Sequence, residues 1–216
     1  MATIKTVIFD FDGVIADSVG IKTRAFAYLF RDYPQSVRDE VVKYHLENGG
    51  KSRYVKFKYY CENILKKEYN DEIGEKLAAE FSEFVFEEVV RCPYIKGAIE
   101  FIETNHEKYL FFIVSGTPDG EIKAIAEKRG ISKYFKEILG TPAKKNEWVG
   151  YILHKYNLLP DETVFIGDAY DDYKGAVENG CRFIGVNSGG HNPFEKLKID
   201  FLVGDLSDIH EKIRTL

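Results

Sequence analysis

An apolar run that ends in a pair of carboxylates near the N-terminus constrains the fold most. Residues 6–9 read TVIF, and residues 10–18 read DFDGVIADS. The apolar run is typical of a buried strand, and strand alternation would point Asp10 and Asp12 to the same side. Gly13 permits a sharp turn directly after the second carboxylate. The stretch therefore predicts a strand that delivers two acids to a site at its carboxyl end.

The composition is that of an ordinary globular protein and narrows the class. The chain has 216 residues, 44% hydrophobic and 30% charged, with a formal net charge of −5. No apolar run of roughly 18 residues predicts a membrane span, no secretory signal is indicated, and no basic block favours nucleic acid. Cys61, Cys92 and Cys181 show neither metal-ligand spacing nor a disulfide pattern. We therefore expect a cytoplasmic protein without a membrane or nucleic-acid partner; its oligomeric state stays open.

The order of the expected elements divides the chain into two units. Helical spacing covers 18–30, 36–47, 52–67 and 71–91, with no convincing strand among them. From residue 93 onward, expected strands at 110–116, 136–140, 163–168, 181–187 and 201–205 alternate with helices at 97–106, 121–130, 145–157, 172–179 and 206–216. Such alternation is typical of a parallel sheet covered on both faces. We predict an α/β core, residues 1–15 and 93–216, interrupted by an all-helical insert, residues 16–92.

Polar residues follow four of the expected strands. They are Asp10 and Asp12; Ser115, Gly116 and Thr117; Lys144 and Lys145; and Gly167, Asp168, Asp171 and Asp172. Ligands of parallel α/β sheets bind outside the carboxyl ends of the strands. We therefore expect these residues to converge on one site.

These four stretches resemble the signatures of the haloacid dehalogenase (HAD) superfamily of aspartate-nucleophile phosphotransferases. DFDGVIADS resembles the first signature, SGT at 115–117 the second, a lysine of GTPAKKNE the third, and GDAYDD at 167–172 the fourth. The resemblance points to the phosphoglycolate phosphatase and β-phosphoglucomutase-like group. It implies a Rossmann-like parallel sheet core, the HAD fold, with residues 16–92 as a helical cap that sets substrate specificity.

The resemblance also implies catalytic roles for both acids of the first signature. Asp10 attacks phosphorus and forms an aspartyl-phosphate, a form of covalent catalysis. Asp12 protonates the leaving alcohol and then deprotonates the attacking water.

The second and third signatures imply a phosphate site. The hydroxyl of Ser115 and the neighbouring backbone of Gly116 and Thr117 bind phosphate oxygens. Lys145, with Lys144 as the alternative, stabilises charge on the transferring oxygens.

The charges of the expected site predict a divalent cation. Asp10, Asp168 and Asp172 carry three negative charges, and a phosphate dianion adds two more. Like charges ~4 Å apart repel by ~4 kcal/mol at an effective dielectric of about 20, and Lys145 alone does not offset this. All-oxygen ligands with a substrate phosphate are typical of Mg²⁺. By resemblance, the backbone carbonyl of Asp12 is a further ligand.

One stretch of the insert is a candidate substrate-binding loop, GGKSR at residues 49–53. This glycine-flexible loop precedes a helix and carries Lys51, Ser52 and Arg53, which are able to reach a substrate group distal to the phosphate. Arg53 is our candidate substrate-binding residue. Alternatively, these residues form only a solvent-exposed helix N-terminus with no role in binding.

The leading hypothesis is a Mg²⁺-dependent phosphatase acting on a small phosphorylated metabolite whose identity stays open. A sugar-phosphate mutase of the β-phosphoglucomutase type shares this machinery, although such mutases commonly carry an acid where this chain has Gly167. A 2-haloacid dehalogenase needs neither Asp12 nor a metal, and a phosphonate hydrolase needs a Schiff-base lysine in the insert and usually lacks the Asp12 acid. A catalytically silent binding or regulatory module is the remaining class.

Overall fold

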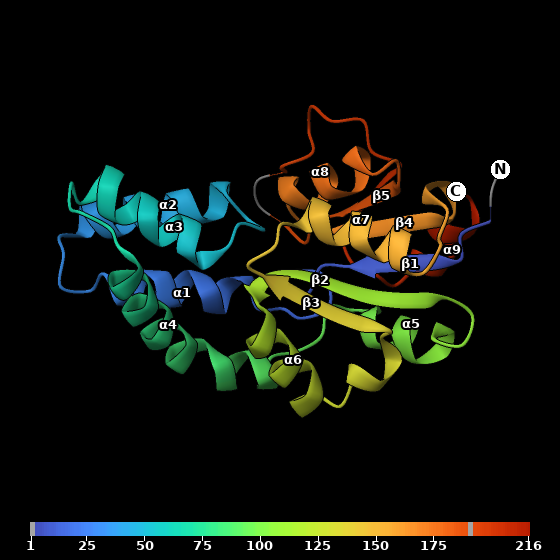
Figure 1. The fold of residues 1–216 in the computed structure, drawn as a ribbon, viewed down its shortest axis with the longest axis horizontal. Helices are drawn as coiled ribbons and strands as arrows, with labels where there is room; N and C mark the ends of the chain where they lie inside the picture. The colour runs from blue at the N-terminus through green and yellow to red at the C-terminus, as the bar shows by residue number, and fades with distance from the viewer. Residues whose placement is uncertain (1–2, 190–191) are drawn as a thin grey trace.

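A parallel six-stranded sheet determines where a site can form. The computed structural model describes residues 3–189 and 192–216. Its strands are β1 (Thr6–Phe9), β2 (Leu110–Pro118), β3 (Glu137–Thr141), β4 (Thr163–Gly167), β5 (Arg182–Val186) and β6 (Phe201–Val203). They pair in parallel in the order β3-β2-β1-β4-β5-β6 (Figure 1). The chain runs outward from β1 first to one side and then to the other, so the carboxyl end of β1 lies at the topological switch point.

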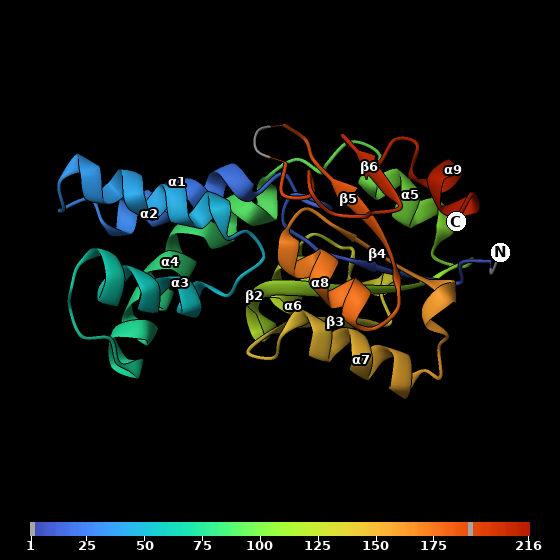
Figure 2. The same ribbon diagram turned by 90° about the horizontal axis from the view of Figure 1, so that it is seen from above.

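Helices cover both faces of this sheet, as predicted (Figure 2). One face carries α5 (Ala98–Asn105), α6 (Asp119–Lys128) and α9 (Ile209–Arg214), and the other carries α7 (Lys145–Lys155) and α8 (Tyr170–Glu178). Because side chains alternate along a strand, Phe9 packs into the first layer and Ile8 into the second. Short 3₁₀ segments at Ser132–Tyr134 and Pro160–Glu162 complete the core.

The insert is helical throughout and lies at one end of the sheet (Figure 1). It contains α1 (Val19–Leu29), α2 (Gln35–Glu47), α3 (Arg53–Tyr59) with a π-helical continuation at Tyr60–Ile64, and α4 (Asp71–Arg91). Side chains cap two of these helices, since Ser52 accepts from the Tyr54 N–H and Asn70 from the Ile73 N–H. The single helix expected over 52–67 is therefore an α-helix that ends in a wider turn.

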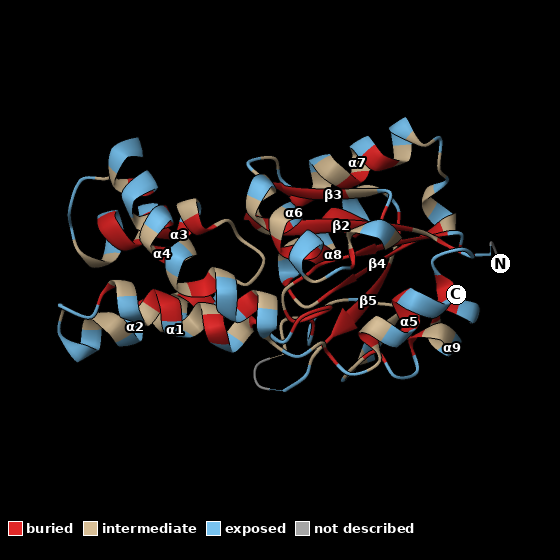
Figure 3. Cartoon of the chain, turned by 90° about the horizontal axis from the view of Figure 1, so that it is seen from below, coloured by how far each residue is buried: buried red, intermediate tan, exposed pale blue. Residues whose placement is uncertain are grey.

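The helices of the insert pack on an aromatic core that is continuous with the core on one face of the sheet, and Figure 3 shows their buried faces. The ring of Phe26 lies 4.5 Å from that of Phe81, 5.8 Å from that of Tyr60 and 5.9 Å from that of Phe57, measured between centroids. Such ring pairs stabilise the fold by more than the area they bury would give.

In the described ranges, no helix combines the length and apolarity needed to cross a membrane.

The chain enters and leaves the insert through two adjacent segments. The Asp17 N–H donates to the Pro93 carbonyl at 3.0 Å, and the Ile95 N–H donates to the Ile15 carbonyl at 2.9 Å. The division at residues 16–92 lies within these segments and stays a prediction.

Replacing Phe111 by alanine tests the core beneath β1. The ring is 1% exposed and lies 5.3 Å from that of Phe9 and 5.7 Å from that of Phe101. We expect Phe111→Ala to lower the free energy of unfolding by about 3–5 kcal/mol in urea denaturation, because it leaves a cavity. Leu202→Ala, at a side chain 46% exposed, is the control and should cost far less. Equal losses would contradict this description of the core.

Candidate active site

The loop after β1 brings two strand ends together. The Asp10 N–H donates to the Ile166 carbonyl at 2.9 Å, which fixes Asp10 beside the end of β4. Gly13 has a φ of +79°, and a Cβ there would lie 2.3 Å from Asp168 Oδ2. Only glycine permits this backbone conformation and this approach without strain. The turn predicted from Gly13 therefore lets the loop pass directly against Asp168.

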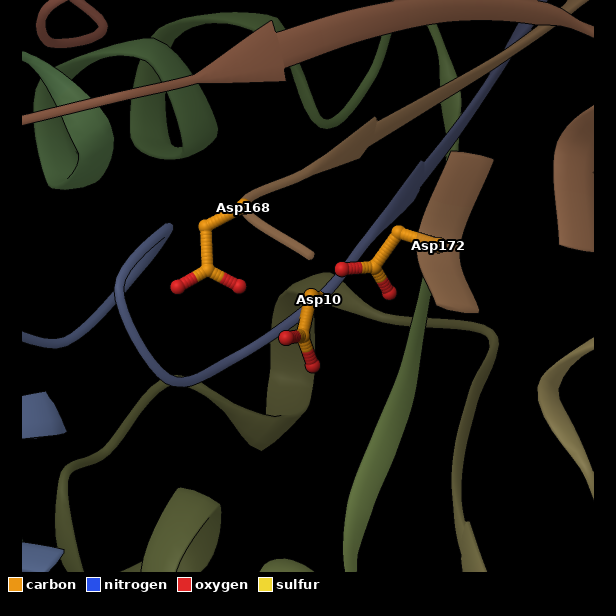
Figure 4. Close-up of side chains that lie close together, drawn as sticks. All are labelled: Asp10, Asp168 and Asp172. Carbon is orange, nitrogen blue, oxygen red and sulfur yellow. The ribbon is translucent and has the colours of Figure 1, made fainter. Parts of the chain in front are cut away.

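Three carboxylates converge at this point (Figure 4). Oxygen atoms of Asp10, Asp168 and Asp172 all lie within 4.8 Å of one another. Burial, and then the negative charge of its neighbours, raises the pKa of Asp168 well above its usual value. Burial likewise raises the pKa of Asp172 to about 7, against the opposing effect of Lys145. The cluster is therefore unfavourable without additional positive charge.

Lys145 supplies part of that charge. Its ammonium donates to Asp172 Oδ1 and lies 3.1 Å from Asp10 Oδ1. Burial opposes its charge, but the carboxylates of Asp10 and Asp172 outweigh burial and raise the pKa of Lys145. Lys144, the alternative, is exposed. The structure thus places Lys145 in the site.

The charge balance and the donor atoms fit a divalent cation. Asp10, Asp168 and Asp172 offer only oxygen atoms, and their three negative charges face the single positive charge of Lys145. Hard divalent cations prefer such oxygen ligands. The added role of the Asp12 backbone carbonyl stays a prediction.

Asp12 is held by a separate set of contacts. The Ser18 hydroxyl donates to Asp12 Oδ1 at 2.6 Å, and the Lys22 ammonium donates to Oδ2. Lys22 also donates to Thr117 Oγ1 at 2.7 Å. Burial opposes ionisation of Asp12, but Lys22 and Ser18 outweigh it and hold its pKa below the usual value. The carboxylate is therefore oriented and ionised.

The end of β2 contacts the insert. Ser115 is buried, and its hydroxyl accepts from the Thr117 N–H at 3.1 Å. A Cβ at Gly116 would lie 2.6 Å from the Gly50 carbonyl oxygen, so glycine lets the insert loop approach. Gly116 and Thr117 line the cavity described next, whereas Ser115 is not among its lining residues. Their phosphate-binding roles stay predictions.

A cavity of about 550 Å³ separates the sheet edge from the insert. Its walls include Asp10, Asp12 and Asp168 on the sheet side, and Phe26, His45 and Lys56 on the helical side. The volume suits a small molecule. Acids from the core and cations from the insert thus face the same space.

Comparison with known proteins identifies the family. The family model for haloacid dehalogenase-like hydrolases matches residues 7–186. The chain belongs to this family. A phosphoglycolate phosphatase of Pasteurella multocida is 26% identical over 222 residues, covering 97% of this chain and 98% of that protein.

Solved structures show the same HAD fold. A HAD hydrolase from Bacillus subtilis bound to magnesium has a TM-score of 0.75 at 19% identity and covers 98% of this chain and 99% of its own. A protein named a β-phosphoglucomutase, from Thermotoga maritima, has a TM-score of 0.71 at 18% identity, with coverage of 99% and 100%. The predicted HAD fold is therefore confirmed, and the chain is an enzyme of a hydrolase family.

Arg53 lies in a different setting from the one expected of this HAD enzyme. Its guanidinium is 4% exposed and donates to Glu121 Oε1 at 2.6 Å, to Glu121 Oε2 at 2.9 Å and to Ser82 Oγ at 2.6 Å. Glu121 belongs to α6 of the core, so this bidentate pair joins insert and core. Arg53 lines the cavity, but these contacts occupy both terminal nitrogens. Its binding to substrate stays a prediction.

The sequence analysis missed Lys22 and the contact made by Ser18. Ser18 precedes α1 and makes no side-chain cap bond, since its hydroxyl contacts Asp12 instead. Lys22 follows Ser18 by four residues, a helical spacing that places both on one face. That spacing was the feature of the sequence from which their shared contact with Asp12 could have been predicted.

Removing one acid of the cluster tests its repulsion. In EDTA at about pH 7.5, we expect Asp168→Asn to raise the free energy of unfolding by about 1 kcal/mol in urea denaturation, because one like charge is lost. The pKa of Asp168 is higher in the folded than in the unfolded state. The free energy of unfolding of the wild type therefore falls as the pH rises from the unfolded to the folded pKa of Asp168, and the stability advantage of Asp168→Asn grows over the same interval.

Adding Mg²⁺ should make the wild type more stable to unfolding than Asp168→Asn. A cation that binds the folded state stabilises the wild type, and the variant should gain much less. Asp161→Asn, an exposed acid outside the site, is the control and should match the wild type. A variant less stable than the wild type in EDTA would contradict the repulsion.

Proposed function

We propose that this HAD enzyme is a Mg²⁺-dependent phosphatase that hydrolyses a small phosphorylated metabolite through an aspartyl-phosphate. The supporting observation is that Asp10 and Asp12 both line the cavity, beside a cluster of acids that fits a divalent cation. The Pasteurella relative is named for phosphoglycolate and the Bacillus structure contains magnesium. Phosphoglycolate is therefore the first substrate to test.

The reaction proceeds in two halves. The Asp10 carboxylate forms a bond to phosphorus, the bond from phosphorus to the leaving alcohol breaks, and the alcohol takes a proton from Asp12. Asp12 then removes a proton from water, whose oxygen attacks phosphorus, releasing phosphate and restoring Asp10. A bound divalent cation supplies positive charge that offsets the phosphate and its neighbouring carboxylates.

The contacts of Asp12 suit both halves. Ser18 and Lys22 fix the direction of the carboxylate, and its ionised form is the base that the second half needs. A phosphate dianion brings negative charge close to Asp12 and favours the protonated form that the first half needs. Lys145, beside Asp10, offsets charge on the transferring oxygens.

The geometry at Gly167 favours hydrolysis over the mutase alternative. A Cβ at this position would lie 2.2 Å from the Cβ of Asp172. The acid that such mutases commonly carry there therefore does not fit this backbone.

The lowered pKa of Lys56 favours a second candidate function, that of a phosphonate hydrolase. Burial, and then Lys22, lowers the pKa of this insert lysine to about 7, and a neutral amine is what Schiff-base formation requires. Asp12 and its contacts favour the phosphatase. Borohydride trapping of Lys56 with phosphonoacetaldehyde, without phosphate release from phosphomonoesters, would instead support the phosphonate hydrolase.

Phosphate release from a panel of phosphorylated metabolites tests the proposal. We expect turnover with Mg²⁺, loss of turnover in EDTA, and a fall of at least about a thousandfold in kcat for Asp10→Asn, because the nucleophile is removed. Asp161→Asn should keep wild-type turnover. Activity that survives in Asp10→Asn would overturn the mechanism, and isomerisation of a sugar phosphate without release would support the mutase.

A further inference from the structure

Lys56 is a buried cation on the insert side of the cavity. It lies on α3, is 3% exposed, and its ammonium lies 2.9 Å from His45 Nδ1 of α2. The ammonium also lies 5.3 Å from the centre of the Phe26 ring. Lys56 and His45 both line the cavity, opposite Asp12 and Asp168. Neither residue has a part in the two-step reaction described above.

Lys56 differs from the neighbouring cations in its charge partner. Lys22 pairs with Asp12, Lys145 with Asp10 and Asp172, and Arg53 with Glu121. Lys51, which also lines the cavity, is only partly buried and donates to Asn48 Oδ1. Within residues 3–189 and 192–216, no carboxylate forms an ion pair with Lys56. A buried cation without a counter-charge is costly, so the position favours binding of an anion.

His45 holds the Lys56 ammonium in place. Burial, and then the charge of Lys56, lowers the pKa of His45 to about 2, so the ring is neutral. When Lys56 is protonated, Nδ1 accepts its hydrogen bond and Nε2 carries the ring hydrogen. Nε2 is buried and has no hydrogen-bond partner in the part of the chain that the structure describes. Because Nδ1 and Nε2 point to opposite sides of the ring, one carboxylate does not accept from both Nε2 and Lys56, so His45 acts by orienting the Lys56 ammonium.

We propose that Lys56, positioned by His45, binds a carboxylate on the leaving alcohol of the substrate. The inference rests on the proposed phosphatase function and names its substrate class, phosphorylated hydroxy acids. One uncompensated positive charge matches a monoanion, whereas a second phosphate group would leave a negative charge unpaired. The hydrogen bond from the Lys56 ammonium to a carboxylate oxygen is charge-assisted.

The volume of the cavity suits a short substrate. Asp12 and Asp168 on the sheet side and Lys56 on the helical side line one cavity of about 550 Å³. The two groups therefore face each other across one small space. A phosphoryl group beside Asp10 and a carboxylate beside Lys56 belong to a molecule with few carbon atoms between them.

A matched pair of substrates tests this inference. In 2-hydroxyethyl phosphate, a hydroxymethyl group replaces the carboxylate of 2-phosphoglycolate. We expect wild-type kcat/KM to favour the acid at least tenfold, and Lys56→Met to reduce that ratio to about one, mainly through KM for the acid. Lys58→Met is the control, because Lys58 lies on the same helix with its side chain 60% exposed, and it should keep the wild-type ratio.

The outcomes separate this inference from the proposed function. Equal wild-type kcat/KM for both compounds would overturn the carboxylate site while leaving the phosphatase intact, and this arm needs no variant. A full preference retained in Lys56→Met would also overturn it. No phosphate release from any phosphomonoester, para-nitrophenyl phosphate included, would overturn the phosphatase and the carboxylate site together.

Discussion

The burial of three like charges, Asp10, Asp168 and Asp172, is the constraint on which the rest of the structure depends. The three carboxylates lie within 4.8 Å of one another, and burial, more than any other cause, raises the folded-state pKa of each, which disfavours folding at neutral pH. Hydrophobic side chains on both faces of the central strands, such as Ile8 and Phe9, fix the backbone and offset that cost. The carboxylates of the site therefore lower the stability of the folded chain, whereas the sheet that carries them raises it. Such a cost is common at functional sites, where residues are placed for binding rather than for stability.

Two kinds of charge come from two parts of the chain. The strand ends of the core supply the acids, whereas the helices of the insert supply Lys22 and Lys56, and a single lysine, Lys145, comes from the core side. Arg53 and Glu121 join the two parts through a bidentate pair that is shielded from solvent and hence from screening by salt. The two walls of the cavity are thus joined by an ion pair of Arg53, the side chain that we expected to contact substrate.

Local pattern predicted the strands, the glycine turn and the acids, because each depends on residues close in sequence. TVIF, Gly13 and the carboxylates after β1 and β4 follow from strand period and backbone conformation. The partners of the cations did not follow, because they are set by packing. Glu121 is separated from Arg53 by 68 positions, and His45 meets Lys56 only where α2 packs near α3. The widened turn after Tyr59 was equally hidden, since helical periodicity in a short window does not distinguish an α-helix from a π-helical end.

The strand order places the chemistry and the substrate selection that we propose on different segments. The insert lies between β1 and β2, and β1 is the central strand at which the connections change direction. A helical unit inserted there is necessarily anchored at the switch point, so residues on its inner surface face whatever binds at the end of β1. In the function that we propose, changes on that surface, at positions such as Lys56, alter which leaving group fits without moving Asp10 or Asp12, whose positions depend on the sheet.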